Sequence, residues 1–327
     1  LLPCDYILII AKHKPHFHCS GAISFAASSF ACNNGGFAVY LNIGCLISRS
    51  QVCIAGENFM DNRPVGFFDS GFGGLTALRA FRKLMPGENI IYFGDTGRMP
   101  YGARPAAQLR RMTVQDLDLL RGFGVKAIVS ACGTTSSTAG DILDAYPLPV
   151  TGVLRPGVKM LAGLAGGAPL GVIATKASID SGAFRRELEK YGLAQDTIYT
   201  SCPDFVPLIE SGHYSPDDAL IHEAVARYLR PMKDAGVCAV LLGCTHYGLI
   251  SDAIEDYMGA ETRLVSASEC AAQELCDKLR ELDMTGGSGE ERYLTSGETG
   301  DFGRMAAIFL GWQPKRGAEH IPPMEVE

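Results

Sequence analysis

The chain has 327 residues, 47% of them hydrophobic, and a formal net charge of −7 at pH 7. This length exceeds that of one ordinary hydrophobic core, so we expect two α/β units. Acidic and basic residues are interspersed, which argues against nucleic acid and anionic membranes as partners. No apolar stretch approaches the ~20 residues that a membrane-spanning helix needs.

The eleven cysteines fall into two groups. Five precede Met60, and six lie in ordinary α/β sequence after it. No pair has the Cys-x-x-Cys spacing of a zinc or redox site, and a long globular chain does not need disulfide bonds for stability. We therefore expect reduced thiols, no bound metal and a cytoplasmic location.

Residues 1–59 form the least regular part of the chain. Their charged residues are only Asp5, Lys12, Lys14, Arg49 and Glu57. They also lack the basic-then-apolar order of a secretory signal. Well-patterned sequence begins abruptly at Met60. We interpret residues 1–59 as a non-native or disordered N-terminal extension, with Met60 as the true start; a poorly packed extension is the alternative.

From Val65 onward, short apolar runs alternate with amphipathic stretches. The runs predict strands at 65–68, 90–93, 127–130, 150–153, 171–174, 197–200, 239–242, 263–265 and 292–295. The amphipathic stretches predict helices, among them 75–85, 107–123, 181–191 and 218–235. This alternation predicts an α/β fold of two pseudo-symmetric, doubly wound parallel-sheet domains, with helices on both faces of each sheet. Ligands then belong at the carboxyl ends of the strands.

A weak internal duplication relates the two domains. In each half, a polar pair at a predicted strand end, Asp69-Ser70 or Thr175-Lys176, precedes a cysteine. If the halves face each other, both cysteines reach one interdomain cleft. We expect the last strand and helix, at 292–310, to return to the first domain. The first domain then comprises residues 60–156 and 267–327, and the second comprises residues 157–266.

Cys132 and Cys244 occupy matching positions. Each closes a predicted strand and is followed by small and hydroxyl residues that can open a helix. The free N–H groups at a helix start favour a thiolate, so these two thiols are candidates for a paired acid and base. Free cysteine is also among the most commonly buried residues. The matched positions, with Thr134 and Thr245 nearby, favour the functional interpretation.

Polar residues at other strand ends are further candidates. Asp69 and Ser70 open a glycine-rich turn that lacks the dinucleotide-binding spacing, and they either form a tight turn or face a ligand. The loop at 94–102 either bends the chain or presents backbone N–H groups and the Tyr101 hydroxyl to a ligand. His246 lies close enough in sequence to hold Cys244 as a thiolate. Glu210 is either a solvated helix residue or part of the same site.

Together these segments resemble the glutamate racemases, a cofactor-independent family, over residues 65–312. The resemblance rests on five motifs in the expected order: Asp69-Ser70-Gly71-x-Gly73-Gly74-Leu75, Gly94-Asp95-Thr96-x-Arg98-x-Pro100-Tyr101-Gly102, Ala131-Cys132-x-Thr134, Cys202-Pro203-x-Phe205-Val206-Pro207-Leu208-x-Glu210 and Leu241-Leu242-Gly243-Cys244-Thr245-His246-Tyr247. Several unusual motifs in one order are far more specific than any single motif.

The resemblance implies a 1,1-proton transfer between L- and D-glutamate, which supplies D-glutamate for peptidoglycan. Cys132 would act on the D-enantiomer and Cys244 on the L-enantiomer, with Asp69, His246 and Glu210 assisting. Substrate contacts would come from Asp69, Ser70, Pro100, Tyr101, Gly102, Gly133, Thr134, Thr245 and His246. The resemblance implies no cofactor, glutamate as a small-molecule substrate, and a homodimer.

Two positions depart from the family pattern. The family usually has Asn where this chain has Gly133, and Glu where it has Arg155. Gly133 removes a side-chain contact to substrate, and Arg155 alters contacts at the segment between the domains. Two alternatives remain open from sequence: a related racemase acting on aspartate or hydantoins, and a catalytically impaired relative that acts as a binding regulator. A pyridoxal enzyme using Lys176 is a third possibility with little support.

Overall fold

The computed structural model describes residues 6–11, 27–31, 37–42 and 60–325, in two compact units, Leu1–Asn58 and Phe59–Glu327. In the first unit, β1 (Tyr6–Ala11), β3 (Phe37–Asn42) and β2 (Ala27–Ala31) form an antiparallel sheet in that order. The sequence patterns predicted no regular element there. The five cysteines before Met60 lie outside the described residues, as does most of the segment that we interpreted as an extension.

The second unit contains two parallel sheets. The first sheet has six strands in the order β13-β12-β5-β4-β6-β7. Their bounds are β4 (Val65–Asp69), β5 (Ile90–Gly94), β6 (Ala127–Ser130), β7 (Val150–Gly152), β12 (Glu291–Thr295) and β13 (Glu319–His320). Every residue of β4, β5 and β6 is buried, as expected for central parallel strands covered on both faces.

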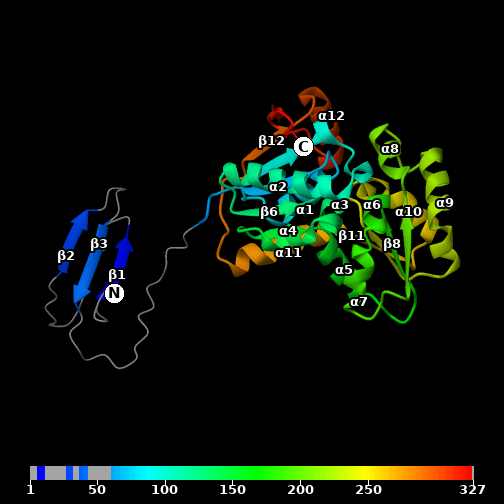
Figure 1. Cartoon of the computed structure of the whole chain (residues 1–327), viewed down its shortest axis with the longest axis horizontal. Coiled ribbons are helices and arrows are strands. Elements are labelled where there is room, and N and C mark those ends of the chain that lie inside the picture. The colour runs from blue at the N-terminus through cyan, green and yellow to red at the C-terminus, as the bar shows by residue number, and fades with distance from the viewer. Residues whose placement is uncertain (1–5, 12–26, 32–36, 43–59, 326–327) are drawn as a thin grey trace. The chain divides into compact units, whose positions relative to one another are not determined.

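The second sheet has four strands in the order β11-β10-β8-β9, also parallel throughout. Their bounds are β8 (Leu170–Ala174), β9 (Thr197–Ser201), β10 (Ala239–Leu242) and β11 (Arg263–Ser266). The helices α8, α9 and α10 gather around this sheet (Figure 1). All nine strands predicted after Val65 are present within a residue or so of their expected ends, which confirms the α/β fold with parallel sheets.

Helices connect the strands. Before the second sheet come α1 (Leu75–Leu84), η1 (Thr96–Arg98), η2 (Tyr101–Ala103), α2 (Ala106–Gly122), α3 (Gly133–Thr138), α4 (Gly140–Ala145) and α5 (Leu154–Gly163). Next come α6 (Lys176–Asp180), α7 (Ala183–Glu189), α8 (Phe205–Glu210), α9 (Ala219–Asp234), η3 (Thr245–Ile250) and α10 (Ser251–Met258). The last are α11 (Ala267–Glu281) and α12 (Thr299–Leu310). None of the helices in the described ranges is long and apolar enough to cross a membrane.

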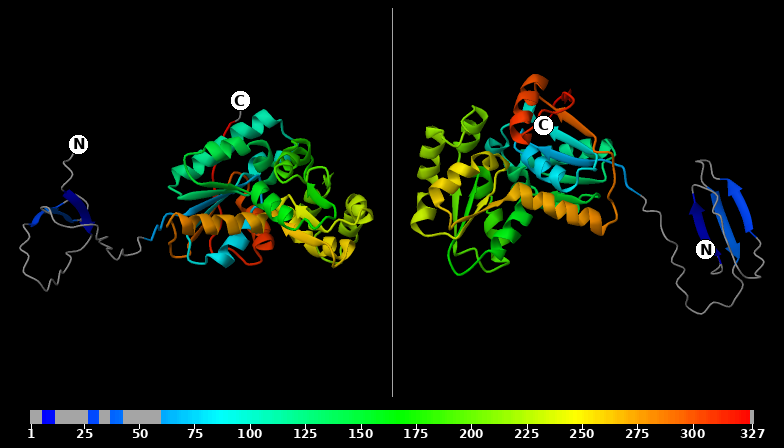
Figure 2. Two further views of the ribbon diagram at one scale, coloured as in Figure 1. Left: turned by 90° about the horizontal axis from the view of Figure 1, so that it is seen from below. Right: turned by 180° about the vertical axis from the view of Figure 1, so that it is seen from behind.

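The C-terminal part of the chain returns to the first sheet. β12 pairs with β5 along five residues, and β13 adds to the other edge of β12. In Figure 2 the orange and red C-terminal elements accordingly lie beside the cyan elements of the first sheet. Helix α11 packs along α1, although the two are far apart in sequence. The carboxyl ends of the first sheet therefore carry loops from both the early and the late part of the chain.

Candidate active site

Asp69 is the last residue of β4 and is buried at the start of the glycine-rich turn. Its Oδ1 accepts a hydrogen bond from the backbone N–H of Gly71 at 2.8 Å. Burial raises the pKa of this carboxyl, while the charge of His246 and the backbone N–H groups oppose the rise. The carboxylate therefore sits in a dry site where a cation would be strongly attracted.

Cys132 follows β6 and caps α3, as the sequence pattern predicted. Its sulfur accepts from the backbone N–H of Thr135 at 3.5 Å, and its thiol donates to Ser70 Oγ at 3.6 Å. Burial, and next the nearby charge of Asp69, nevertheless raise the pKa of this thiol to about 11. Our expectation that the helix start favours a thiolate at Cys132 was wrong, because desolvation outweighs the backbone donors.

Cys244 follows β10 in the equivalent place and precedes η3. Its Sγ lies 3.9 Å from Nδ1 of His246, and Nε2 of the same ring lies 3.0 Å from Oε1 of Glu210. Burial alone lowers the pKa of His246, but the contacts with Cys244 and Glu210 raise it to about 10. The ring is therefore an imidazolium at neutral pH, and its positive charge lies beside the Cys244 sulfur.

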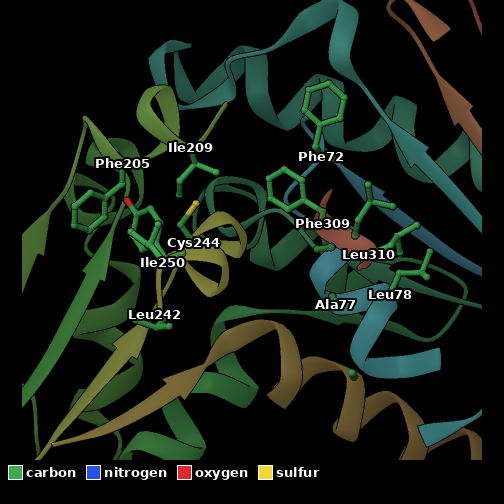
Figure 3. Packing of buried hydrophobic residues seen from close by; sticks show 14 of the residues in the cluster. Phe72, Ala77, Leu78, Phe205, Ile209, Leu242, Cys244, Ile250, Phe309 and Leu310 are labelled. Atoms are coloured by element: carbon green, nitrogen blue, oxygen red, sulfur yellow. The ribbon is translucent and has the colours of Figure 1, made fainter. Parts of the chain in front are cut away.

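Apolar side chains surround the Cys244 turn. Figure 3 shows the Cys244 sulfur beside Ile209 of α8, with Phe72 and Phe309 across from it. Phe309 also meets the His246 ring edge-on, with ring centroids 5.1 Å apart. Such walls keep water from the thiol and strengthen the electrostatic interactions inside.

The two cysteine turns meet directly. Thr245 Oγ1 of the second turn donates to Asp69 Oδ2 at 3.5 Å. On the first turn, a Cβ placed on Gly133 would come 2.3 Å from the carbonyl oxygen of Gly243 and 3.7 Å from Cα of Cys244. The two thiol-bearing segments, one from each sheet, are thus in backbone contact at the shared end of the sheets.

Tyr101 does not present its hydroxyl to an open space. The hydroxyl bonds to both Asp95, at the start of the 94–102 loop, and Asp116 of α2, at 3.0 Å from the latter. Arg98 bridges the same two carboxylates, at 2.6 Å from Asp95 and 2.8 Å from Asp116. We call Asp95, Arg98, Tyr101 and Asp116 the carboxylate cluster. It immobilises the loop that carries the predicted substrate contacts Pro100 and Gly102.

Sequence reasoning missed Asp116 and the role of Arg98. Asp116 falls on the buried stripe of α2 with Leu109, Met112 and Leu120, and an acid on such a stripe is the signal that could have identified it. Burial raises the pKa of Asp116 well above its ordinary value, and the nearby charge of Asp95 adds to the rise. Tyr101 lies in one buried cluster with Leu109, Met112 and Cys132, so the carboxylate cluster also supports the first thiol.

Hydroxyl groups line the junction between the sheets. Thr134 Oγ1 lies 3.2 Å from Thr175 Oγ1, which in turn lies 2.9 Å from Ser178 Oγ. Thr175 is the N-cap of α6, which follows β8, and Ser178 lies within that helix; neither was among the predicted contacts. Ser70 lies at the first thiol and Gly102 lies beside Thr175. The predicted substrate contacts all belong to strand ends or to the segments that directly follow β4, β5, β6 and β10.

Two other residues singled out from sequence lie elsewhere. Lys176 is exposed and paired with Asp180, which places it on the surface. Arg155 is also exposed, and its guanidinium bonds to Asp144 at 2.6 Å and lies 3.8 Å from Glu187. Arg155 therefore joins α4 to α7, in keeping with an effect on contacts between the two sheets.

A family model for Asp/Glu/Hydantoin racemase matches residues 77–275. The chain belongs to this racemase family. The glutamate racemase of Beutenbergia cavernae is 40% identical over 270 residues, which cover 77% of this chain and 91% of that protein. This membership confirms the resemblance inferred from the five motifs.

Solved structures of the racemase family share the fold. The Francisella tularensis glutamate racemase in complex with D-glutamate has a TM-score of 0.74 and 32% identity, covering 81% of this chain and 99% of that one. The Thermus thermophilus glutamate racemase in complex with β-chloro-D-alanine has a TM-score of 0.72 and 35% identity, covering 80% and 98%. The fold of this chain is thus similar to the folds of these two racemases.

Proposed function

We propose that the chain is a glutamate racemase that interconverts L- and D-glutamate with Cys132 and Cys244 as its two acid–base groups. The observation that supports this most directly is the backbone contact between the two cysteine turns, which approach from different sheets. Inversion of a stereocentre needs proton removal on one face and delivery on the other. Two opposed thiols do this directly. The relatives at 32 to 40% identity are glutamate racemases.

In the L-to-D direction, the Cys244 thiolate takes the α-proton. The C–H bond breaks, an S–H bond forms, and the electron pair passes into the substrate carboxylate. The Cys132 thiol then gives its proton to the opposite face, which leaves Cys132 as the thiolate. The reverse direction exchanges the two roles. No electrons leave the substrate, and each turnover leaves one thiol and one thiolate.

The electrostatics differ between the two thiols. His246, whose pKa is raised to about 10, supplies positive charge beside Cys244. Cys132 has the carboxylate of Asp69 nearby instead, and its pKa is raised to about 11 by burial and that charge. A substrate ammonium held by Asp69 would neutralise this carboxylate and so lower the pKa of Cys132 in the complex. Closing the site around substrate would strengthen these effects.

The remaining residues of the site contact the substrate or orient a neighbouring side chain. Asp69, Ser70, Pro100, Tyr101, Gly102, Gly133, Thr134, Thr245 and His246 hold the substrate, and Glu210 orients His246. Tyr101 contributes through its backbone and ring, since its hydroxyl is bonded in the carboxylate cluster.

The protein acts in the cytoplasm as a homodimer, supplies D-glutamate for peptidoglycan, and uses no cofactor. Residues 60–156 with 267–327 and residues 157–266 form the two domains.

Incubation with L- or D-glutamate in D₂O tests the proposal. Circular dichroism should show the ellipticity of either enantiomer decaying toward zero, and mass spectrometry should show one deuterium at the α-carbon. Cys132→Ser and Cys244→Ser should each lower racemisation by at least about 100-fold while the far-ultraviolet spectrum stays unchanged. Aspartate tested in parallel distinguishes a related racemase. Absence of α-deuterium in glutamate with the pure, folded protein would contradict the proposal and favour a binding role.

A further inference from the structure

A close backbone contact leaves no room for a side chain at Gly133. Its backbone dihedral φ lies outside the left-handed region, so the backbone itself would accept a side chain. The obstacle is the carbonyl oxygen of Gly243, only 2.3 Å from the place of a Cβ. Carbon and oxygen atoms in contact lie roughly 3.4 Å apart, so a single added carbon would displace one turn from the other by about 1 Å.

A second glycine makes the same kind of contact. A Cβ on Gly73 would come 2.3 Å from Nδ1 of His246 and 2.5 Å from Oγ1 of Thr245. Gly73 also has φ outside the left-handed region. The first sheet thus meets the Cys244 turn at two places that have no room for a side chain: Gly73 lies against His246, and Gly133 lies against Gly243.

We infer that Gly133 sets the spacing between the Cys132 and Cys244 turns, and so determines how closely the two sulfurs can approach one α-carbon. This inference rests on the proposed function for its effect on catalysis. Gly133 can contact substrate only through its backbone, and its effect on spacing is that of a positioning residue acting through Gly243. The atom that Gly133 contacts is the backbone carbonyl oxygen of Gly243, the residue directly before Cys244. A displacement of Gly243 would therefore also move Cys244.

A spacing role for Gly133 predicts that a side chain at this position is harmful. The family usually has Asn there, and restoring a family residue is normally expected to help. In this chain Gly133→Asn should instead lower activity, because its Cβ meets the same oxygen and its amide needs further room. Proton transfer is sensitive to such shifts: a misplacement of about 1 Å can cost about 100-fold in rate.

The test compares Gly133→Ala and Gly133→Asn with Gly140→Ala. Gly140, at the start of α4, has no atom within 4 Å of a built Cβ and also has φ outside the left-handed region. We expect kcat/KM for glutamate to fall by about 100-fold in both Gly133 variants, mainly through kcat, and to stay unchanged in Gly140→Ala. Crystal structures should show the Cα atoms of residues 132 and 244 about 1 Å or more further apart in both Gly133 variants, and unmoved in Gly140→Ala.

The outcomes separate this inference from the proposed function. An inactive wild type contradicts the proposed function, whereas the crystallographic separation tests the spacing without any activity. Unchanged or increased kcat/KM in either Gly133 variant would overturn the inference. Unfolding of Gly133→Ala, followed by melting temperature, would overturn it too, because the contact would then be needed for folding rather than for spacing.

Discussion

Glu210 lies behind His246: its Oε1 is 3.0 Å from Nε2 of the ring. The opposite nitrogen, Nδ1, is 3.9 Å from the sulfur of Cys244. Although burial lowers the pKa of His246, the contacts with Cys244 and Glu210 raise it to about 10, so the ring carries a proton on both nitrogens at neutral pH. The carboxylate thus acts on the thiol through the ring between them.

The protonated ring should stabilise the fold in a pH-dependent way. The pKa of His246 is raised from 6.5 to about 10, so the folded state holds this proton more tightly than the unfolded chain does. Its contribution is complete below pH 6.5 and disappears as pH rises through about 10. We expect His246→Gln to lower the free energy of unfolding most at low pH, with the difference from wild type shrinking toward pH 10. Urea unfolding across this pH range measures the free energy for both proteins. A difference that does not change with pH would contradict the raised pKa of His246.

Replacing Glu210 should change the ring without removing it. Glu210→Gln keeps a hydrogen-bond acceptor at Nε2 but removes the charge, so the pKa of His246 should move down toward its ordinary value. NMR titration of the ring proton measures that pKa directly. Racemisation at pH 8 should fall by about 10-fold, since less positive charge then faces Cys244. An unshifted titration in Glu210→Gln would show that Cys244 alone holds the proton.

Alkylation should report the environment of Cys132. Burial and the charge of Asp69 raise its pKa to about 11, and only the thiolate reacts with iodoacetamide. Labelling of Cys132 should therefore be slow at pH 8 and should increase toward pH 11. Asp69→Asn should accelerate it at pH 8. Cys276 is an internal control, because its pKa is also raised to about 11 by burial but owes nothing to Asp69. Peptide mapping by mass spectrometry resolves the two; equal acceleration at both would indicate general loosening.

The carboxylate cluster should tolerate an amide but not an apolar residue at position 116. Because burial favours the neutral form of Asp116, Asp116→Asn should cost little stability and keep the bonds to Arg98 and Tyr101. Asp116→Leu removes the hydrogen-bond acceptor that faces the buried Arg98 guanidinium and the Tyr101 hydroxyl, and should cost about 2 to 3 kcal/mol. Urea unfolding gives both values, and KM for glutamate should rise only in the leucine variant. Equal destabilisation by the two substitutions would show that the negative charge itself is required.

A buried ion pair at the opposite end of the first sheet should affect stability alone. The side chains of Lys126 and Glu88 are 0% and 3% exposed, with Nζ 2.6 Å from Oε2. Lys126 also donates to the backbone carbonyls of Asp61 and Gly286. Lys126→Met should lower the free energy of unfolding by about 3 to 5 kcal/mol, because the buried Glu88 carboxylate then loses its positively charged partner. The double variant with Glu88→Leu should lose less than the sum of the single changes, and kcat should not change in any of them.

Much of the fold follows from local patterns in the sequence. Central parallel strands are short, fully apolar runs bounded by polar turns, so β4, β5, β6 and β10 were readily predicted. β13 was missed because its two residues, Glu319 and His320, are both exposed and carry no apolar signal. The chain's return to the first sheet was expected only because β12 came after the second half had supplied its strands.

Some residues of the candidate site could likewise be predicted from local sequence, and others could not. Cys132, Cys244 and Asp69 could be singled out because strand ends and turns mark them locally. Asp116 and the contact of Gly133 with Gly243 could not, because each depends on a partner distant in the sequence. The raised pKa of Cys132 was also missed, since a local helix start favours the thiolate and only the packed structure reveals the competing desolvation.

The order of strands in the first sheet bears on how the chain folds as it is synthesised. β5 is central in the finished sheet, yet its neighbour β12 leaves the ribosome after the whole second sheet. Until then, the nascent protein exposes one side of β5, Ile90–Gly94, as an edge of apolar residues with free backbone groups. Fragments that stop short of residue 291 should therefore self-associate, and chaperones that bind extended apolar segments should engage the chain at this strand.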